Sequence, residues 1–156
     1  MTPTFSQSRG TASRARVIAA VNSLLADETG SIMERLREAE PYIPATAADE
    51  AFAVQELVDE DARHAEQLVH LLDRLRATPG PRCVNIDTGD LHYNRLHALL
   101  PRLIADQQRL ISRYEAAQSV VVEEPAAADV VGAVLNSHRA HLARLEKLAA
   151  AAKAGS

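Results

Sequence analysis

Polar side chains that can bind a metal ion or transfer protons interrupt four apolar helical patterns in this chain. They comprise two carboxylates, one amide and three imidazoles: Glu28, Asp61, His64, Gln107, His138 and His141. Burying such groups in a helical core costs several kcal/mol unless they are paired, hydrogen-bonded or bound to a metal. Their recurrence in four segments therefore indicates one shared buried site.

The spacing of the neighbouring apolar residues places each polar group on the buried face of a helix. Steps of three and four residues follow one face of a helix, and the polar residues take the same steps as the leucines around them. The four faces are Leu24, Glu28 and Ile32; Leu57, Asp61, His64 and Leu68; Leu103, Gln107 and Leu110; and Val134, His138, His141 and Leu145.

Counting from the expected turns places these groups at a similar depth. Glu28 lies fifteen residues before a turn near Ile43, and Asp61 lies eighteen residues after it. The second pair of segments, on either side of a turn near Glu123, repeats this spacing. At about 1.5 Å of rise per residue, the offsets amount to roughly one helical turn. We therefore expect the six side chains to meet in one layer.

Length and composition predict a single all-α domain. The chain has 156 residues, of which 47% are hydrophobic and 24% are charged, and it is rich in strong helix formers. Proline and glycine residues divide it into four helices. We expect a disordered tail over 1–13 and one domain over 14–152, with helices at about 14–40, 47–77, 89–119 and 126–151.

The connection between the second and third helices is the longest. Residues 78–88, at about 3.3 Å per residue, can extend along most of a helix bundle, whereas antiparallel neighbours need only a few residues. This predicts a crossover, and hence a ferritin-like four-helix bundle. Pro101 predicts either a kink in the third helix or a start later than Asp90.

Two segments carry a resemblance to a known family. Residues 24–32 (LLADETGSI) resemble the opening helix of bacterioferritins, and residues 61–68 (DARHAEQL) resemble the Glu-x-x-His-Ala segment of bacterioferritins and rubrerythrins. The resemblance extends over about 14–150. It implies a lone Glu from each of two helices and a Glu-x-x-His from each of the other two, which together hold two iron or manganese ions.

The family pattern is only partly kept. Glu28 matches the first lone Glu, and His64 and His141 match the two histidines. Three positions that carry Glu in the family differ here: Asp61, Gln107 and His138. Two carboxylates neutralise one divalent ion, so we expect a single metal, or one tight and one weak site.

The family resemblance and the number of carboxylates together predict which residues bind the metal. The expected ligands are Glu28, Asp61, His64, His138 and His141, and the expected outer residues are Gln107, Asp106 and Glu60. Iron is the expected metal, with manganese and zinc as alternatives. Haem is not expected, because Met33 is out of register for an interface ligand. Tyr114, on the same helix face as Gln107, is interpreted as a core residue.

The predicted function is metal binding with oxidation of Fe(II) by oxygen or peroxide. Two alternatives stay open: a noncatalytic binding or assembly module that holds no metal, and an oxidase or hydroxylase that acts on an organic substrate. The family resemblance implies a homo-oligomer. A net charge of -4 argues against nonspecific nucleic-acid binding. No segment is long enough to span a bilayer, so we expect a cytoplasmic protein.

Overall fold

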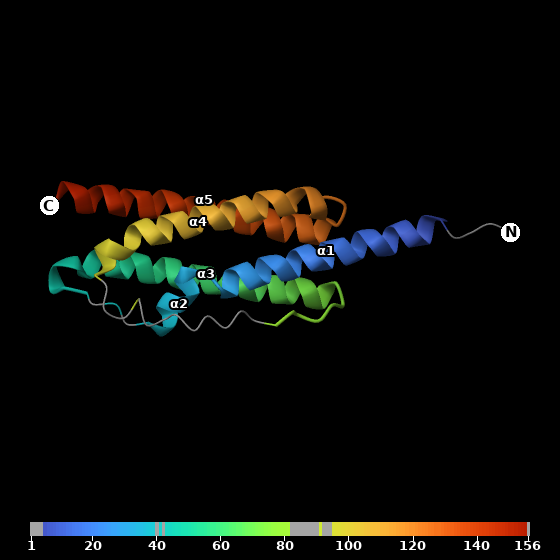
Figure 1. The fold of residues 1–156 in the computed structure, drawn as a ribbon, viewed down its shortest axis with the longest axis horizontal. Helices are drawn as coiled ribbons and strands as arrows, with labels where there is room; N and C mark the ends of the chain where they lie inside the picture. Colours follow the sequence, from blue (N-terminus) through green and yellow to red (C-terminus); the bar gives the residue numbers. More distant parts are fainter. Residues whose placement is uncertain (1–4, 40, 42, 82–90, 92–94, 156) are drawn as a thin grey trace.

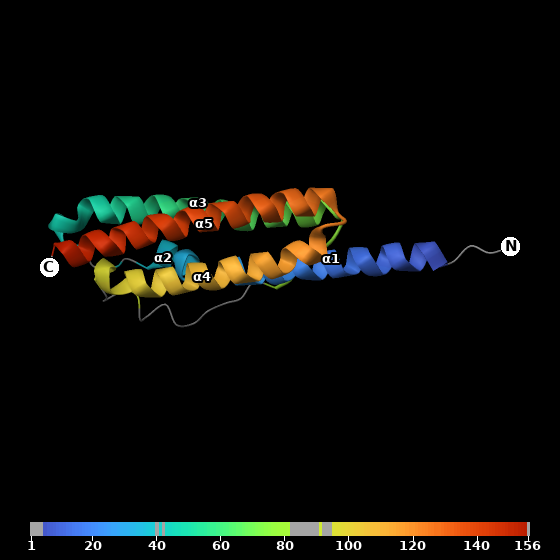
Figure 2. The same ribbon diagram turned by 90° about the horizontal axis from the view of Figure 1, so that it is seen from above.

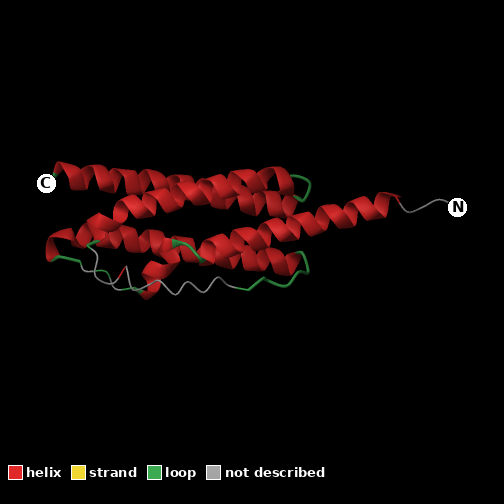
Figure 3. Ribbon diagram, in the orientation of Figure 1, coloured by secondary structure: helices red, strands yellow, loops and turns green. Residues whose placement is uncertain are grey.

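A computed structural model describes residues 5–39, 41, 43–81, 91 and 95–155 of the chain. The described residues form helices and no strand, which confirms the all-α prediction (Figure 3). The α-helices are α1 (Phe5–Thr29), α2 (Ile32–Glu38), α3 (Ala48–Arg74), α4 (Leu96–Val121) and α5 (Pro125–Ala154). A short 3-10 helix, Ala45–Ala47, precedes α3.

The four long helices lie side by side in two layers. One view pairs α1 with α3 and α4 with α5 (Figure 1), and the perpendicular view pairs α1 with α4 and α3 with α5 (Figure 2). Each long helix therefore packs against two others. Helices α3 and α4 run in the same direction, while α1 and α5 run opposite to them (Figure 1). The end of α3 and the start of α4 consequently lie at opposite ends of the molecule.

The apolar core consists of two clusters along the helix axes. One contains Val21 and Leu24 of α1 together with Leu68 of α3, and the other contains Ile32 of α2 together with Leu57 of α3. The six polar positions fall between these clusters on every long helix. Apolar packing on both sides thus fixes the depth and the rotation of each helix around the polar layer.

The first predicted helix, 14–40, is broken in the structure into α1 and α2. Ser31 caps α2, because its Oγ accepts a hydrogen bond from the Glu34 backbone N–H at 3.2 Å. The Ile32 backbone N–H donates to Asp106 Oδ2 on α4 at 2.7 Å. Both donors belong to the first turn of a helix, where the backbone has no partner of its own. The prediction of one continuous helix is therefore corrected.

The first helix also begins earlier than predicted. It starts at Phe5 and extends beyond the ends of its neighbours (Figure 1). The predicted disordered tail, 1–13, overlaps this helix from Phe5 onward, while residues 1–4 lie outside the described residues. The helix is held near its middle, where the Arg14 guanidinium donates to the Leu75 carbonyl at 2.6 Å.

The other helix boundaries lie close to their predicted positions. Helix α3 (Ala48–Arg74) is shorter at both ends than the predicted 47–77. Helix α5 (Pro125–Ala154) is slightly longer at both ends than the predicted 126–151. Helix α4 begins at Leu96, after Asp90, which is one of the two outcomes predicted from Pro101. The residues 82–90, which include Cys83 and the predicted start at 89, lie outside the described residues.

Candidate metal centre

The six predicted polar residues meet midway along the four long helices. We call them the polar cluster: Glu28 in the last turn of α1, Asp61 and His64 on α3, Gln107 on α4, and His138 and His141 on α5. None of the six exposes more than 4% of its surface. The centroids of the three imidazole rings lie 4.7–6.0 Å apart. The prediction that these side chains converge in one layer is confirmed.

One half of the polar cluster is centred on His138. Its Nε2 lies 2.7 Å from Glu28 Oε1, and its Nδ1 lies 2.8 Å from Gln107 Oε1. The Tyr114 hydroxyl donates to the same Glu28 oxygen at 2.5 Å. Both ring nitrogens of His138 are thus engaged, and Glu28 is held by groups from α4 and α5.

The other half is centred on Asp61. The Gln107 amide donates to Asp61 Oδ2 at 3.3 Å, and His141 Nδ1 lies 2.8 Å from Asp61 Oδ1. His141 Nε2 in turn lies 2.7 Å from Glu60 Oε2. Gln107 therefore joins the two halves, because its oxygen contacts His138 and its nitrogen contacts Asp61.

His64 stands between the two halves. Its Nε2 lies 2.9 Å from the Ser137 hydroxyl, which also lies 3.3 Å from His141 Nε2. Its Nδ1 is buried and has no hydrogen-bond partner among the described residues; the nearest carboxylate oxygen, on Asp61, is 3.5 Å away. The second carboxylate oxygen of Glu28, Oε2, is likewise buried and unpaired. Two potential ligand atoms are therefore buried without a hydrogen-bond partner among the described residues.

Burial governs the protonation of this site. It raises the pKa of Glu28 to about 8, against the lowering effect of the Tyr114 hydrogen bond. Burial also lowers the pKa of His64 and of His138 to about 4 each. For His141, burial favours the neutral ring, but the hydrogen bonds and charges of Asp61 and Glu60 outweigh it and raise the pKa.

These protonation states give one consistent direction of donation along the network. At neutral pH the Glu28 carboxylic acid donates to His138 Nε2, so His138 Nδ1–H donates to Gln107. The Gln107 amide then donates to Asp61, which also accepts from His141 Nδ1–H. The amide orientation of Gln107 agrees with both of its neighbours. An uncharged glutamine at this position avoids placing another carboxylate beside Asp61.

Two groups of three side chains have ligand atoms close enough to surround one ion. In each group the atoms lie within 4.8 Å of one another: Glu28, His64 and His138 form one group, and Asp61, His64 and His141 form the other. His64 belongs to both groups. A neutral imidazole binds an ion through one nitrogen, and the other nitrogen then donates to a neighbour, which here is Ser137.

The three predicted outer residues have different surroundings. Gln107 is itself a member of the polar cluster and contacts His138, and Glu60 contacts the cluster through His141. Asp106 instead accepts from the Ile32 backbone at the start of α2 and pairs with Arg109 on its own helix.

Two residues of the site were not predicted to take part. Tyr114 is a core residue, as predicted, but its hydroxyl also donates to Glu28. Ser137 lies one helical turn before His141 on α5, and this spacing is the signal that could have indicated it.

Comparisons with protein-family models, with curated proteins and with solved structures found no match for this chain. Within the described residues, no helix combines the length and the apolar character that crossing a membrane requires.

Proposed function

We propose that this chain is a ferritin-like metal-binding protein whose polar cluster binds one divalent transition-metal ion. The arrangement of the long helices supports this, because α3 and α4 run in parallel (Figures 1 and 2) and all four long helices contribute residues to one buried layer. The ligand pattern supports it further: a glutamate on the first helix, an Asp-x-x-His on α3 and a His-x-x-His on α5.

The observation that carries the proposal is the pair of unpaired atoms, Glu28 Oε2 and His64 Nδ1. Both are buried, and the network satisfies every other nitrogen and oxygen of the polar cluster. A buried carboxylate or imidazole atom without a partner is unfavourable, and ligation of a cation removes that cost. These two residues also belong to the same candidate ligand group, together with His138.

The charges and ligand types favour one ion of the transition series. Two carboxylates, Glu28 and Asp61, balance the charge of one divalent ion. Both candidate groups need His64, which supports a single ion per chain. Mixed imidazole and carboxylate ligation suits iron, manganese and zinc. Bound iron would supply one-electron chemistry toward oxygen or peroxide, so oxidation of Fe(II) is the activity we propose.

Metal binding requires each ligand to be in its deprotonated form, and the residues of the cluster differ in how many protons they must release. Glu28 holds a proton at neutral pH and must release it to become a ligand. The Tyr114 hydroxyl continues to donate to Glu28 and stabilises the carboxylate that results. His64 and His138 are already neutral, which is the form that binds a metal. Ser137 keeps the ring of His64 in one orientation.

A metal-free assembly module is the second candidate, and Gln107 favours it. Its amide satisfies His138 and Asp61 simultaneously, as expected for a purely structural hydrogen-bond network. Such a network still leaves Glu28 Oε2 and His64 Nδ1 without partners. The metal-binding proposal accounts for these two atoms, and the module does not.

Metal analysis and titration separate the two candidates. Purified protein is stripped with chelator and titrated with Fe(II), Mn(II) and Zn(II), with one bound ion per chain expected. The variant with both His64→Gln and His141→Gln should lose binding. A control with both His70→Ala and His97→Ala, two exposed histidines outside the polar cluster, should keep it.

Each outcome of this experiment has a defined meaning. Absence of stoichiometric binding in the parent overturns the metal-binding proposal and leaves the assembly module. Binding of Fe(II) without oxygen uptake above the autoxidation background overturns the oxidase activity alone. Thermal unfolding of every variant confirms that a loss of binding is not a loss of folding.

A further inference from the structure

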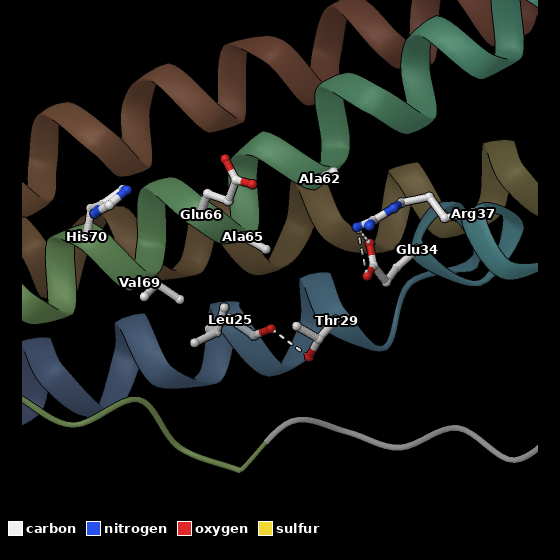
Figure 4. Close-up of a pocket in the computed structure, with 9 residues that line it drawn as sticks. All are labelled: Leu25, Thr29, Glu34, Arg37, Ala62, Ala65, Glu66, Val69 and His70. Carbon is white, nitrogen blue, oxygen red and sulfur yellow. Dashed lines mark hydrogen bonds and ion pairs between the residues drawn. The ribbon is translucent and has the colours of Figure 1, made fainter.

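The polar cluster is closed off from solvent, so an ion that binds there needs a route from the surface. Every candidate ligand is at least nine-tenths buried. Two surface features adjoin the cluster. One is a group of charged residues between α3 and α5, and the other is a pocket between α1, α2 and α3 (Figure 4).

A chain of contacts connects the surface between α3 and α5 with the buried ligands. The Glu60 side chain is 40% exposed, yet its Oε2 accepts from His141 Nε2 at 2.7 Å. Its other oxygen accepts from the Arg144 guanidinium at 3.4 Å, and the same guanidinium donates to Glu56 Oε2 at 3.0 Å. Glu60 is therefore a carboxylate that faces solvent and touches a candidate ligand.

We propose that Glu56, Glu60 and Arg144 form the access site through which a divalent transition-metal cation reaches the polar cluster. We call these three residues the α3–α5 mouth. The incoming cation displaces the Arg144 guanidinium, binds between the two carboxylates, and passes from Glu60 to His141. This inference rests on the proposed function, because it concerns the route to the same buried site.

The charges of the α3–α5 mouth suit this role. Two carboxylates facing one another repel, and a cation between them removes that repulsion; Arg144 now fills this position. All three side chains are 40–50% exposed, and such surface pairs each contribute only about 0–1 kcal/mol. A divalent cation can therefore replace the guanidinium at little cost. Arg144 also keeps the route closed when no cation is present.

The pocket between α1, α2 and α3 is a poorer route for the ion. Its volume is about 400 Å³. Leu25, Ala62 and Ala65 form apolar walls, and Glu34 is paired with Arg37 on α2 at one end of the pocket (Figure 4). Within the described residues, no hydrogen bond joins a lining side chain of this pocket to the polar cluster. An ion in this pocket would therefore find no surface residue in contact with a buried ligand, as Glu60 is in contact with His141.

Binding kinetics with Co(II) test the route. Co(II) is chosen because its visible absorption changes when the ion leaves water for a site of nitrogen and oxygen ligands. Loading is followed by stopped flow after mixing with chelator-stripped protein, and release is followed after addition of excess chelator. The two rate constants and the equilibrium titration are measured for the parent, Glu60→Gln and Arg144→Gln.

Matched controls remove the same charges elsewhere on the same helices. Glu66→Gln removes a carboxylate that lies on α3 and lines the alternative pocket. Arg139→Gln removes a guanidinium of α5 that pairs with Glu115 at 2.8 Å. Both side chains lie outside the polar cluster and the α3–α5 mouth.

The expected result is a change in both rates that is much larger than the change in affinity, since Glu60 also contacts the candidate ligand His141. A residue on the route changes the rate at which the ion enters and the rate at which it leaves. Glu60→Gln should therefore slow both loading and release by at least about tenfold. Arg144→Gln should speed both. The amide oxygen that Glu60→Gln introduces can still accept from His141, which keeps the buried site intact. The two controls should behave as the parent does.

Several results would overturn the inference. If Glu60→Gln leaves both rates unchanged while the parent binds Co(II), the route is wrong and the proposed function stands. If Glu66→Gln slows loading instead, the ion passes through the pocket. If Glu60→Gln changes only the release rate and the affinity, Glu60 is a final ligand and not an access residue. If the parent binds no Co(II) at all, the proposed function fails as well.

Discussion

Glu28 should make the metal-free protein less stable as the pH rises from 6.5 to 8. Burial raises its pKa to about 8 in the folded state, against 4.5 for an exposed glutamate. Between these values the folded state holds a proton that the unfolded state has released, so the free energy of unfolding falls with pH. The raised pKa of His141 likewise lowers the free energy of unfolding as the pH rises. The lowered pKa values of His64 and His138 act with the opposite sign, mostly below pH 6.5 and only weakly above it.

The magnitude follows from the pKa of Glu28. Each unit of difference between the pKa in the folded state and in the unfolded state corresponds to about 1.4 kcal/mol in the free energy of unfolding. Over the interval from pH 6.5 to 8, the Glu28 carboxyl should therefore remove about 2 kcal/mol from the free energy of unfolding. For a chain of this length, the melting temperature should fall by roughly 4–8 °C. In Glu28→Gln, which carries no titrating carboxyl, this part of the decline should be absent.

The assay is urea or thermal unfolding of chelator-treated protein at several pH values in this interval. Glu34→Gln, at a half-buried residue of α2 paired with Arg37, is the matched control and should decline as the parent does. Saturating Zn(II) should reverse the trend, because the ion replaces the proton of Glu28 and binds more tightly as the pH rises.

Two results would refute this reasoning. A parent whose free energy of unfolding stays constant or rises over the interval would show that Glu28 is not protonated in the folded state. A Glu28→Gln variant that declines as steeply as the parent would place the titrating group elsewhere, with His141 as the next candidate.

Three further predictions concern the surroundings of the site. Tyr114→Phe removes the donor to Glu28 and should cost about 1–3 kcal/mol of stability at pH 8, measured by urea unfolding, with a smaller cost at pH 6 where Glu28 is protonated. Gln107→Glu adds a carboxylate between His138 and Asp61; it should destabilise the metal-free protein by about 1–3 kcal/mol and raise the number of bound Mn(II) ions per chain in equilibrium dialysis. Ser31→Ala removes the cap of α2 and should cost about 1 kcal/mol in thermal unfolding, with metal stoichiometry unchanged.

Helical periodicity was sufficient to identify every member of the polar cluster. The position of a residue on a helix face follows from its spacing, so a polar side chain in an apolar row must face the core. Depth followed as well, because the rise per residue is constant and the turns are marked by proline. The buried positions of Glu28, Gln107 and His138 could therefore be predicted before any helix was placed in space.

The break after α1 could not be predicted in this way. It depends on Asp106, which lies on α4 and accepts from the Ile32 backbone N–H. Ser31 supplies a local cap, but a serine in a helical pattern is also compatible with a continuous helix. Only the packing of α4 against this junction selects between the two.

The amino-acid sequence alone thus determined which side chains are buried together, since burial follows from local periodicity. The tertiary structure decided which atoms meet. Gln107 joins His138 to Asp61, and Glu60 connects His141 with the surface, because hydrogen bonds require separations near 3 Å. Such distances depend on the rotation and spacing of neighbouring helices, which only the packing of the whole core sets.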